Sequence, residues 1–224
     1  MDKSILHQLY PFSGMPQDLL RTLVNMTSYR LYAQGQLIID LQEGRDRTLI
    51  LVSGLARVYR ISTQGKELTL AKFVTGDILG LAPNDPILQP SNLLEAIADG
   101  TGICRVPREH FQQIIISDPE IASYCFCQLS ERLGKAYDLI EEVVFMDVCT
   151  RLARTLSRLA KANEQRLVTA THQELAGMIG TSQEEVTRKL RHLRELGLIN
   201  YQPHHRGIVV PNPDRLLSEL NDLT

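Results

Sequence analysis

The chain has 224 residues, of which 43% are hydrophobic and 22% charged, and its formal net charge is −2. This composition is typical of a folded globular protein rather than a disordered one, and no apolar run reaches the ~18 residues that suggest a membrane span. The first residues lack the basic start and apolar centre of a secretory signal, so we expect a cytoplasmic protein without a membrane partner. The charge is uneven, with −4 on residues 1–146 and +2 on residues 147–224. Nucleic acid, if it binds, is therefore expected at the C-terminal part.

Between about Tyr29 and Val106, glycines divide the chain into short apolar runs, and alternation of apolar and polar residues is visible in Leu55–Ile61. Short strands at such spacing are typical of an antiparallel sandwich or roll. The expected strands are Gln36–Leu41, Thr48–Val52, Leu55–Ile61 and Glu67–Phe73, with hairpin turns at Ser53-Gly54 and Thr63–Lys66. We predict an N-terminal β-roll domain over residues 1–117.

A long helix is predicted over residues 118–146, with Asp118 as N-cap and Pro119 in the first turn. Its apolar residues follow the 4-3 spacing of a coiled-coil seam: Ala122, Phe126, Leu129, Leu133, Ala136, Ile140 and Val143. Such a seam indicates packing along a partner helix, here in a homodimer. The alternative is that the same stripe packs on the sheet of its own domain.

The four cysteines, Cys104, Cys125, Cys127 and Cys149, do not show the spacing of a zinc site. Two residues apart on a helix, Cys125 and Cys127 point in different directions, so they are poorly placed to bind one metal ion. We interpret the cysteines as packed thiols and keep redox sensing as the alternative.

Two short helices joined by a glycine are predicted in residues 147–224, the third domain. Thr171 and Glu174 have the spacing of a capping box before the first helix, and Gly180 can end that helix in the left-handed conformation. Ser182 and Glu185 have the spacing of a second capping box. This order is that of a helix-turn-helix, whose second helix enters the DNA major groove.

The start of the second helix carries side chains that can bond to base edges: Gln183, Glu184, Thr187 and Arg188. Glu184 and Arg188 could also form an ordinary i,i+4 surface ion pair. A hairpin at 198–210 follows as a wing. Candidate phosphate contacts are Thr171, Thr181, Ser182, Lys189, Arg191, His205 and Arg206, while adjacent His204 and His205 make a poor metal site.

With these elements in order, the chain resembles the CRP/FNR family of regulators over nearly its whole length. The stretches that carry the resemblance are Leu49–Tyr59, Thr75–Gly80, Phe145–Arg154 and Gly180–Arg188. The resemblance implies an α+β fold: an antiparallel β-roll (double-stranded β-helix), a long dimerisation helix and a C-terminal winged helix-turn-helix. It also implies Glu184 and Arg188 as base readers, an inverted-repeat DNA site, and RNA polymerase as a partner.

Departures from the family concern the effector. Members that bind cyclic AMP have Gly-Glu and then Arg-Ser/Thr at the phosphate; here the first pair is Gly80-Leu81 and no arginine lies between Lys72 and Arg105. Cyclic AMP is therefore not expected, because a buried phosphate would lack its counter-charge. Iron–sulfur members have cysteines before the roll, and this chain has none before Cys104.

The effector itself stays open. Haem remains possible, with His7 and His110 as the histidines outside the DNA-binding domain. An effector pocket is predicted between roll and long helix, and its lining would be Leu79, Leu81, Leu88, Leu93, Leu94 and Phe126.

Three function classes remain to be weighed. The sequence shows no catalytic metal spacing, serine elbow or phosphate-cradling loop, so we do not expect an enzyme. We expect a DNA-binding regulator controlled by an effector, or by a redox or gas signal. The alternatives are a haem-based gas sensor of the same family and a ligand-binding module whose winged helix makes only protein contacts.

Overall fold

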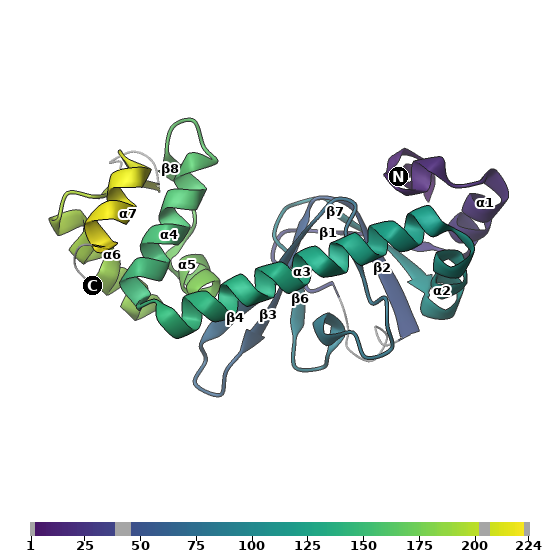
Figure 1. Ribbon diagram of the computed structural model, residues 1–224, viewed down its shortest axis with the longest axis horizontal. Helices are drawn as coiled ribbons and strands as arrows, with labels where there is room; N and C mark the ends of the chain where they lie inside the picture. The colour runs from purple at the N-terminus through teal and green to yellow at the C-terminus, as the bar shows by residue number, and fades with distance from the viewer. Residues whose placement is uncertain (1–2, 39–45, 202–206, 222–224) are drawn as a thin grey trace. The chain divides into compact units, whose positions relative to one another are not determined.

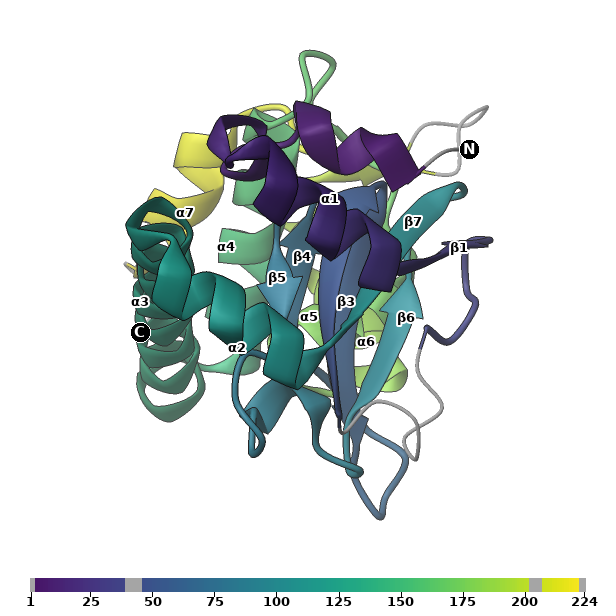
Figure 2. The ribbon, with the colours of Figure 1, turned by 90° about the vertical axis from the view of Figure 1, so that its right-hand side faces the viewer.

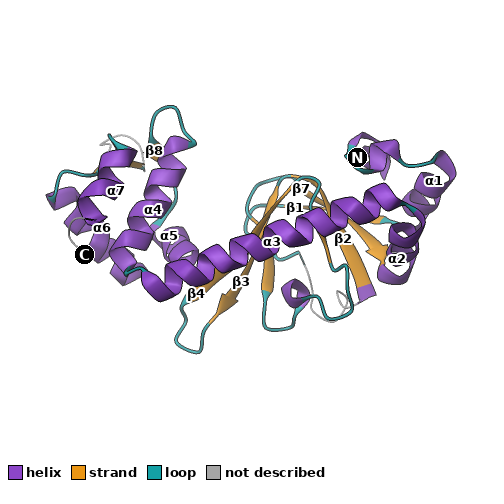
Figure 3. Cartoon of the chain, in the orientation of Figure 1, coloured by secondary structure: helices purple, strands orange, loops and turns teal. Residues whose placement is uncertain are grey.

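The computed structural model describes residues 3–38, 46–201 and 207–221. These residues form two compact units, one of residues up to 60 with 70–135, the other of residues 61–69 with 136 onward. Figure 1 shows the course of the chain, and Figure 3 shows that strands dominate the middle of the first unit while helices dominate the second. Each unit is described by itself.

The first unit contains two sheets. One has the strand order β1-β7-β2-β5 and the other β4-β3-β6. The strands are β1 (Ser28–Tyr32), β2 (Arg47–Ser53), β3 (Leu55–Ile61), β4 (Glu67–Val74), β5 (Ile78–Leu79), β6 (Leu93–Ala96) and β7 (Thr101–Pro107). Strands β1 and β7, β2 and β7, β2 and β5, and β3 and β6 pair antiparallel. The predicted α+β fold with an antiparallel roll is confirmed.

The burial of strand β2 on both of its faces explains why the expected strand Thr48–Val52 is almost entirely apolar. Successive strand residues point to opposite faces of a sheet. Leu49 and Leu51 belong to the buried cluster that also holds Val58 of β3. Ile50 and Val52 belong to a second cluster, which is covered by helices. Because both faces are buried, the strand lacks the polar alternation seen in β3.

Short helices cover the second cluster: η1 (Lys3–Gln8), η2 (Phe12–Gly14), α1 (Gln17–Met26) and α2 (Arg108–Ser117). Their buried side chains include Leu6, Phe12 and Phe111, which pack with Ile50. Figure 2 shows α1 and α2 beside the strands of the roll. A further short helix, η4 (Pro86–Leu88), lies in the loop between β5 and β6.

Two details of the predicted roll need correction. Ser53-Gly54 is not a hairpin turn, because β2 and β3 lie in different sheets. Gly54 instead forms a corner with φ +79°, where an added Cβ would lie 2.7 Å from the Cα of Thr101. The expected strand at Gln36–Leu41 is reduced to an isolated bridge between Leu37 and Glu95 in its described part, and residues 39–41 lie outside the described residues.

Helix α3 runs from Pro119 to Phe145 without interruption. The carboxylate of Asp118 accepts hydrogen bonds from the backbone N–H groups of Glu120 (3.0 Å) and Ile121 (3.3 Å), as expected for an N-cap. Ile121, Cys125 and Gln128 form its buried face. Of the predicted seam, Ala122 is half-buried and the other six residues are exposed, so the stripe does not pack on the sheet of its own domain.

The second unit is built around the helices α4 (Val148–Lys161), α5 (His172–Ile179), α6 (Gln183–Glu195) and α7 (Pro213–Asn221). Short strands β8 (Leu167–Val168), β10 (Ile208–Val209) and β9 (Asn200–Tyr201) form a three-stranded sheet in the order β8-β10-β9. A single buried cluster joins Leu152, Leu175, Val186, Leu190 and Ile208 across these elements.

Candidate nucleic-acid interface

Helices α5 and α6 form the predicted helix-turn-helix. The hydroxyl of Thr171 accepts the backbone N–H of Glu174 (3.1 Å), and the Glu174 carboxylate accepts that of Thr171 (2.7 Å), which completes a capping box. Gly180 ends α5 with φ +68°, a left-handed conformation that glycine adopts at little cost. The turn between the helices is therefore fixed by the chain's local chemistry.

The second predicted capping box is only half formed. Ser182 accepts the backbone N–H of Glu185 (3.3 Å), as expected for an N-cap. The Glu185 carboxylate, however, pairs with the guanidinium of Arg188 in the next turn instead of bonding back to the cap. Arg188 thus pairs with Glu185 (i,i+3) rather than with Glu184, its partner in the alternative interpretation of a surface ion pair.

The exposed face of α6 carries the predicted base readers. Val186, Leu190 and Leu193 are fully buried on one side of the helix. Gln183, Glu184, Arg188 and Arg191 are exposed. Thr187 is half-buried, and its hydroxyl bonds to the carbonyl of Gln183 (2.9 Å) and to the ring of His172 (2.9 Å). The helix therefore presents the carboxylate of Glu184 and the guanidinium groups of Arg188 and Arg191 to solvent on the face opposite its core.

The two charged side chains among the predicted base readers are held in their ionised forms. Hydrogen bonds from its own backbone N–H and from Ser182 lower the pKa of Glu184. The hydrogen bond and the charge of Glu185 raise the pKa of Arg188. At neutral pH the face thus offers an acceptor-only carboxylate and a five-donor guanidinium, the groups that suit cytosine N4 and guanine O6/N7.

The predicted phosphate contacts occupy different environments. Thr171 and Ser182 are capping residues, Thr181 is buried, and Arg191 is exposed. Lys189 is half-buried on the flank of α6, and its charge acts on Asp147 at the start of α4. His205 and Arg206, like His204, lie outside the described residues.

The wing is shorter and more complex than the sequence suggested. In the first half of the hairpin expected at 198–210, only Asn200–Tyr201 form a strand, while Leu198 and Ile199 are buried in the core. Strand β8, which sequence reasoning missed, pairs with β10 on the side opposite β9. A two-residue strand carries too little periodicity to be recognised. The guanidinium of Arg194 lies over the ring of Tyr201, 5.8 Å from its centre, and links α6 to the wing.

The leucines predicted to line an effector pocket separate into two groups. Leu79 and Leu94 are buried in the cluster between the sheets, and Leu88 packs against it. Leu81 packs against the other cluster. Leu93 is half-buried, and Phe126 is exposed on α3 with 71% of its surface accessible. The structure therefore brings Leu79, Leu88 and Leu94 together but not Leu81 or Phe126.

Three of the four cysteines are buried, and Cys127 is exposed. Burial raises the pKa of Cys125 to about 11 and also raises the pKa of Cys149. Since the thiolate is the reactive form, these two thiols are poor nucleophiles at neutral pH. Of the histidines considered for haem, His7 lies exposed in η1 and His110 lies half-buried in α2.

Comparison with known proteins agrees with both halves of this arrangement. Residues 29–118 match the model of the cyclic nucleotide-binding domain, and residues 150–219 match that of the Crp-like helix-turn-helix domain. The chain belongs to the CRP/FNR family. As a CRP/FNR-type transcriptional regulator, it has α5 and α6 as the helix-turn-helix of its DNA-binding domain.

Relatives of this CRP/FNR protein span most of its length. It is 29% identical over 188 residues to the cAMP-activated global transcriptional regulator CRP of Pasteurella multocida, covering 80% of this chain and 88% of the relative. It is 28% identical over 209 residues to the cyclic AMP receptor protein of Thermus thermophilus, covering 93% and 95%. A putative CRP/FNR regulator from Eubacterium rectale has the same fold, with TM-score 0.76, 22% identity and coverage of 93% and 97%. Among the described residues, no helix has the length and apolar character to cross a membrane.

Proposed function

We propose that this protein is a homodimeric, sequence-specific DNA-binding regulator controlled by a signal received in the β-roll. The observation that carries the proposal is the uncovered apolar stripe of α3 in a chain whose α6 presents Glu184 and Arg188 to solvent. The three proposed parts are the sensor domain 1–117, the dimerisation helix 118–146 and the DNA-binding domain 147–224.

The stripe on α3 supports the dimer. Exposed apolar patches of this kind on a folded protein mark interaction surfaces. The exposed large side chains on the seam are Phe126, Leu129, Leu133, Ile140 and Val143, with 46–71% of their surfaces accessible. A second copy of α3 supplies the same 4-3 repeat and can interlock with it. The small Ala122 and Ala136 let the two helix backbones approach closely.

The proposed DNA contacts follow from the faces of α6. Arg188 would bond to guanine, Glu184 to cytosine, and Gln183 and Thr187 to neighbouring base edges. The proposed phosphate contacts are Thr171, Thr181, Ser182, Lys189, Arg191, His205 and Arg206. A two-fold dimer would read an inverted repeat whose half-site centres are ~34 Å apart, and RNA polymerase is the proposed further partner.

The names of relatives suggest cyclic AMP as the signal. The residues of this chain do not fit that ligand, because the 73–104 stretch contains no arginine to neutralise a phosphate. We propose another effector, acting on the part of the roll near Leu79, Leu88 and Leu94, with Leu81 and Leu93 alongside.

A comparison of Arg188→Ala with Lys135→Ala, an exposed residue of α3, tests base reading. The first variant is expected to lose roughly five- to hundredfold affinity per half-site for the selected sequence and to keep its affinity for scrambled DNA. Equal losses on both DNAs would contradict base reading by Arg188.

Leu133→Asp tests the dimer, and Lys135→Asp on the outer face of the same helix is its control. We expect light scattering to give a monomer for the first variant and a dimer for the second, because a buried, unpaired carboxylate is strongly unfavourable. If Leu133→Asp formed a dimer of undiminished stability, the proposal that this seam is the dimer interface would be contradicted.

A further inference from the structure

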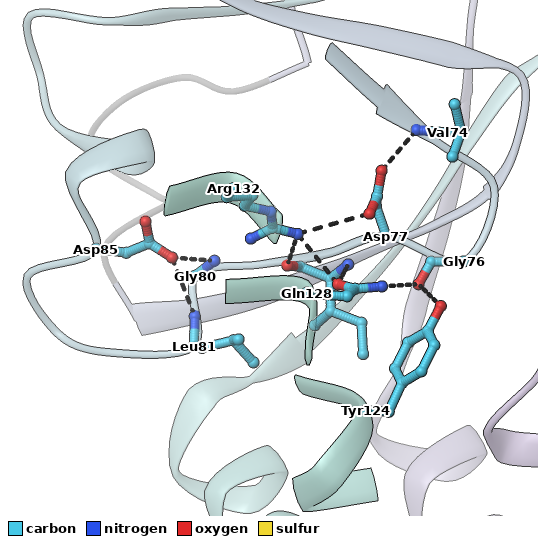
Figure 4. A network of polar contacts seen from close by, with 10 residues as sticks. Val74, Gly76, Asp77, Gly80, Leu81, Asp85, Tyr124, Gln128 and Arg132 are labelled. Carbon is cyan, nitrogen blue, oxygen red and sulfur yellow. Dashed lines mark hydrogen bonds and ion pairs between the residues drawn. The ribbon is translucent and has the colours of Figure 1, made fainter. Parts of the chain in front are cut away.

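The side chain of Asp85, which is only 8% exposed, sits among backbone N–H groups of its own loop. One carboxylate oxygen accepts hydrogen bonds from the N–H groups of Gly80 (2.9 Å) and Leu81 (3.3 Å). The other oxygen accepts the N–H of Ile87 (3.0 Å). Figure 4 shows the Asp85 carboxylate turned toward Gly80 and Leu81. The two oxygens together thus accept three backbone hydrogen bonds. Proteins use this arrangement to hold a bound oxyanion.

This arrangement is more than the cap of a short helix. Two of the three donors, Gly80 and Leu81, precede η4 and follow β5 directly. Buried backbone N–H groups need a partner, since leaving one unpaired is costly. If the Asp85 carboxylate were removed, the loop would therefore present three unpaired N–H groups, two of them outside the short helix.

The peptide around Gly80 is held from the other side as well. Its carbonyl accepts hydrogen bonds from the hydroxyl of Thr48 (3.0 Å) and the guanidinium of Arg108 (2.9 Å), both of which are buried. Gly80 has φ +73°, and an added Cβ would lie 2.5 Å from the carbonyl oxygen of Arg47. The donors that face Asp85 are consequently fixed in place by the roll.

Strand β5 connects this loop to helix α3. Ile78 of β5 donates its N–H to the side-chain oxygen of Gln128 (3.0 Å) and accepts a hydrogen bond from Arg132 (2.6 Å) through its carbonyl. The carbonyl of Gly76 accepts hydrogen bonds from Tyr124 (3.2 Å) and Gln128 (3.1 Å). Figure 4 shows these α3 side chains along the turn that leads into β5. Only Leu79 separates Ile78, which α3 holds, from Gly80, which Asp85 holds.

We propose that the loop 80–87 is an oxyanion-binding loop whose occupant is the chain's own Asp85 carboxylate, and that β5 passes the state of this loop to α3. An external phosphate or carboxylate could enter only by displacing Asp85 and would meet its like charge. The loop is part of the region that matches the cyclic nucleotide-binding model, yet its amide donors are already bound. The Asp85 carboxylate therefore satisfies the amide donors of this loop without a ligand.

Amide hydrogen exchange of the full chain, followed by NMR, tests the proposal. In Asp85→Ala, the N–H groups of Gly80, Leu81 and Ile87 are expected to exchange roughly ten- to hundredfold faster, the size of effect that follows loss of a hydrogen bond to a charged group. Adding formate should restore the protection, whereas chloride at the same ionic strength should not. The control is Asp99→Ala, which removes another carboxylate that accepts a backbone N–H, that of Gln34 (2.9 Å), and should leave the loop unchanged.

Asp85→Asn keeps the size of the side chain and covers the case in which Asp85→Ala does not fold. Its neutral amide oxygen should protect the three N–H groups less well than the carboxylate does, and protection equal to that of the parent would overturn the need for an anion. Protection that persists in Asp85→Ala without formate would overturn the proposal as well.

Faster exchange of the Ile78 N–H in either variant supports transmission through β5, and unchanged exchange there contradicts it. None of these readouts depends on DNA binding or dimerisation, so the proposed function can fail or stand separately.

Discussion

The ring Nδ1 of His172 lies 2.9 Å from the hydroxyl oxygen of Thr187. His172 is the first residue of α5 and Thr187 lies in the second turn of α6, so this contact joins the two helices of the helix-turn-helix. The Thr187 hydroxyl donates its one proton to the carbonyl of Gln183 (2.9 Å). It must then accept from His172, which requires the tautomer with the proton on Nδ1.

We expect His172→Ala to destabilise the C-terminal unit by about 1 kcal/mol, the usual net value of one hydrogen bond. Thr187→Ala should cost a similar amount, and the double variant less than the sum of the two, because the residues share one interaction. Denaturant unfolding of the four proteins measures this coupling. His192→Ala, at an exposed position of α6, is the control. Strictly additive losses would mean that the contact contributes nothing.

The pair between Glu185 and Arg188 is expected to compete with the proposed base reading, because the guanidinium would leave the carboxylate to reach a base edge. Glu185→Gln should therefore raise the affinity for the selected site, by no more than about fivefold per half-site, since exposed ion pairs are weak. Fluorescence anisotropy with specific and scrambled DNA checks this.

Glu195→Gln is the matched control, since it removes one negative charge from the exposed end of the same helix. If both variants gain equally on both DNAs, the effect is general electrostatics, and competition for Arg188 is ruled out.

Gly134 lies inside α3 at an exposed position, and an added Cβ there meets no atom within 4 Å. Gly134→Ala should stabilise the helix by about 0.5–1 kcal/mol through the lower backbone entropy of the unfolded chain. Gly180→Ala is expected to act in the opposite direction by about 1–2 kcal/mol, because Gly180 has φ +68°. Thermal unfolding followed by circular dichroism distinguishes them, and a lower melting temperature for Gly134→Ala would contradict this reasoning.

The sequence predicted best where local chemistry decides the structure. The Thr171–Glu174 capping box, the left-handed Gly180 and the Asp118 cap involve residues within a few positions of one another, and all three are confirmed. Glycine spacing and the change to helical periodicity predicted an antiparallel sandwich or roll and a long helix, whereas the complete α+β fold was implied by the resemblance to the CRP/FNR family.

Prediction failed where the partner of a residue lies far along the chain. The corner at Gly54 depends on Thr101, and no pattern near Gly54 reveals that the next strand joins another sheet. The Asp85 loop depends on the backbone donors Gly80 and Leu81, five and four residues away, and on the tertiary contact of Gly80 with Arg108. Leu79 and Leu81 are two residues apart and would share a face of a regular strand, but β5 ends at Leu79 and the chain turns at Gly80 (φ +73°), so the two side chains pack in different clusters.

Asp147, the N-cap of α4, makes the stability of the second unit pH-dependent. Its carboxylate accepts the backbone N–H of Thr150 at 2.7 Å. Partial burial alone would raise its pKa, but the hydrogen bonds from Thr150 and the charge of Lys189 outweigh burial, and the pKa of Asp147 lies below its ordinary value. Because the folded state holds the proton less tightly than the unfolded state, the stabilisation is complete only above about pH 5, and it is lost as the pH falls through the ordinary pKa and then through the lowered one.

Asp147→Asn tests this, since asparagine caps a helix as well as aspartate but does not titrate. We expect the parent's advantage over this variant at pH 7 to shrink between about pH 5 and pH 3, whereas Asp147→Ala should lose about 1 kcal/mol at every pH above that range. The protection factor of the Thr150 N–H, measured by hydrogen exchange, reports both effects. Asp138→Asn, at an exposed position of α3, should leave it unchanged. A constant difference between the parent and Asp147→Asn down to pH 3 would show that the charge of Asp147 does not stabilise α4.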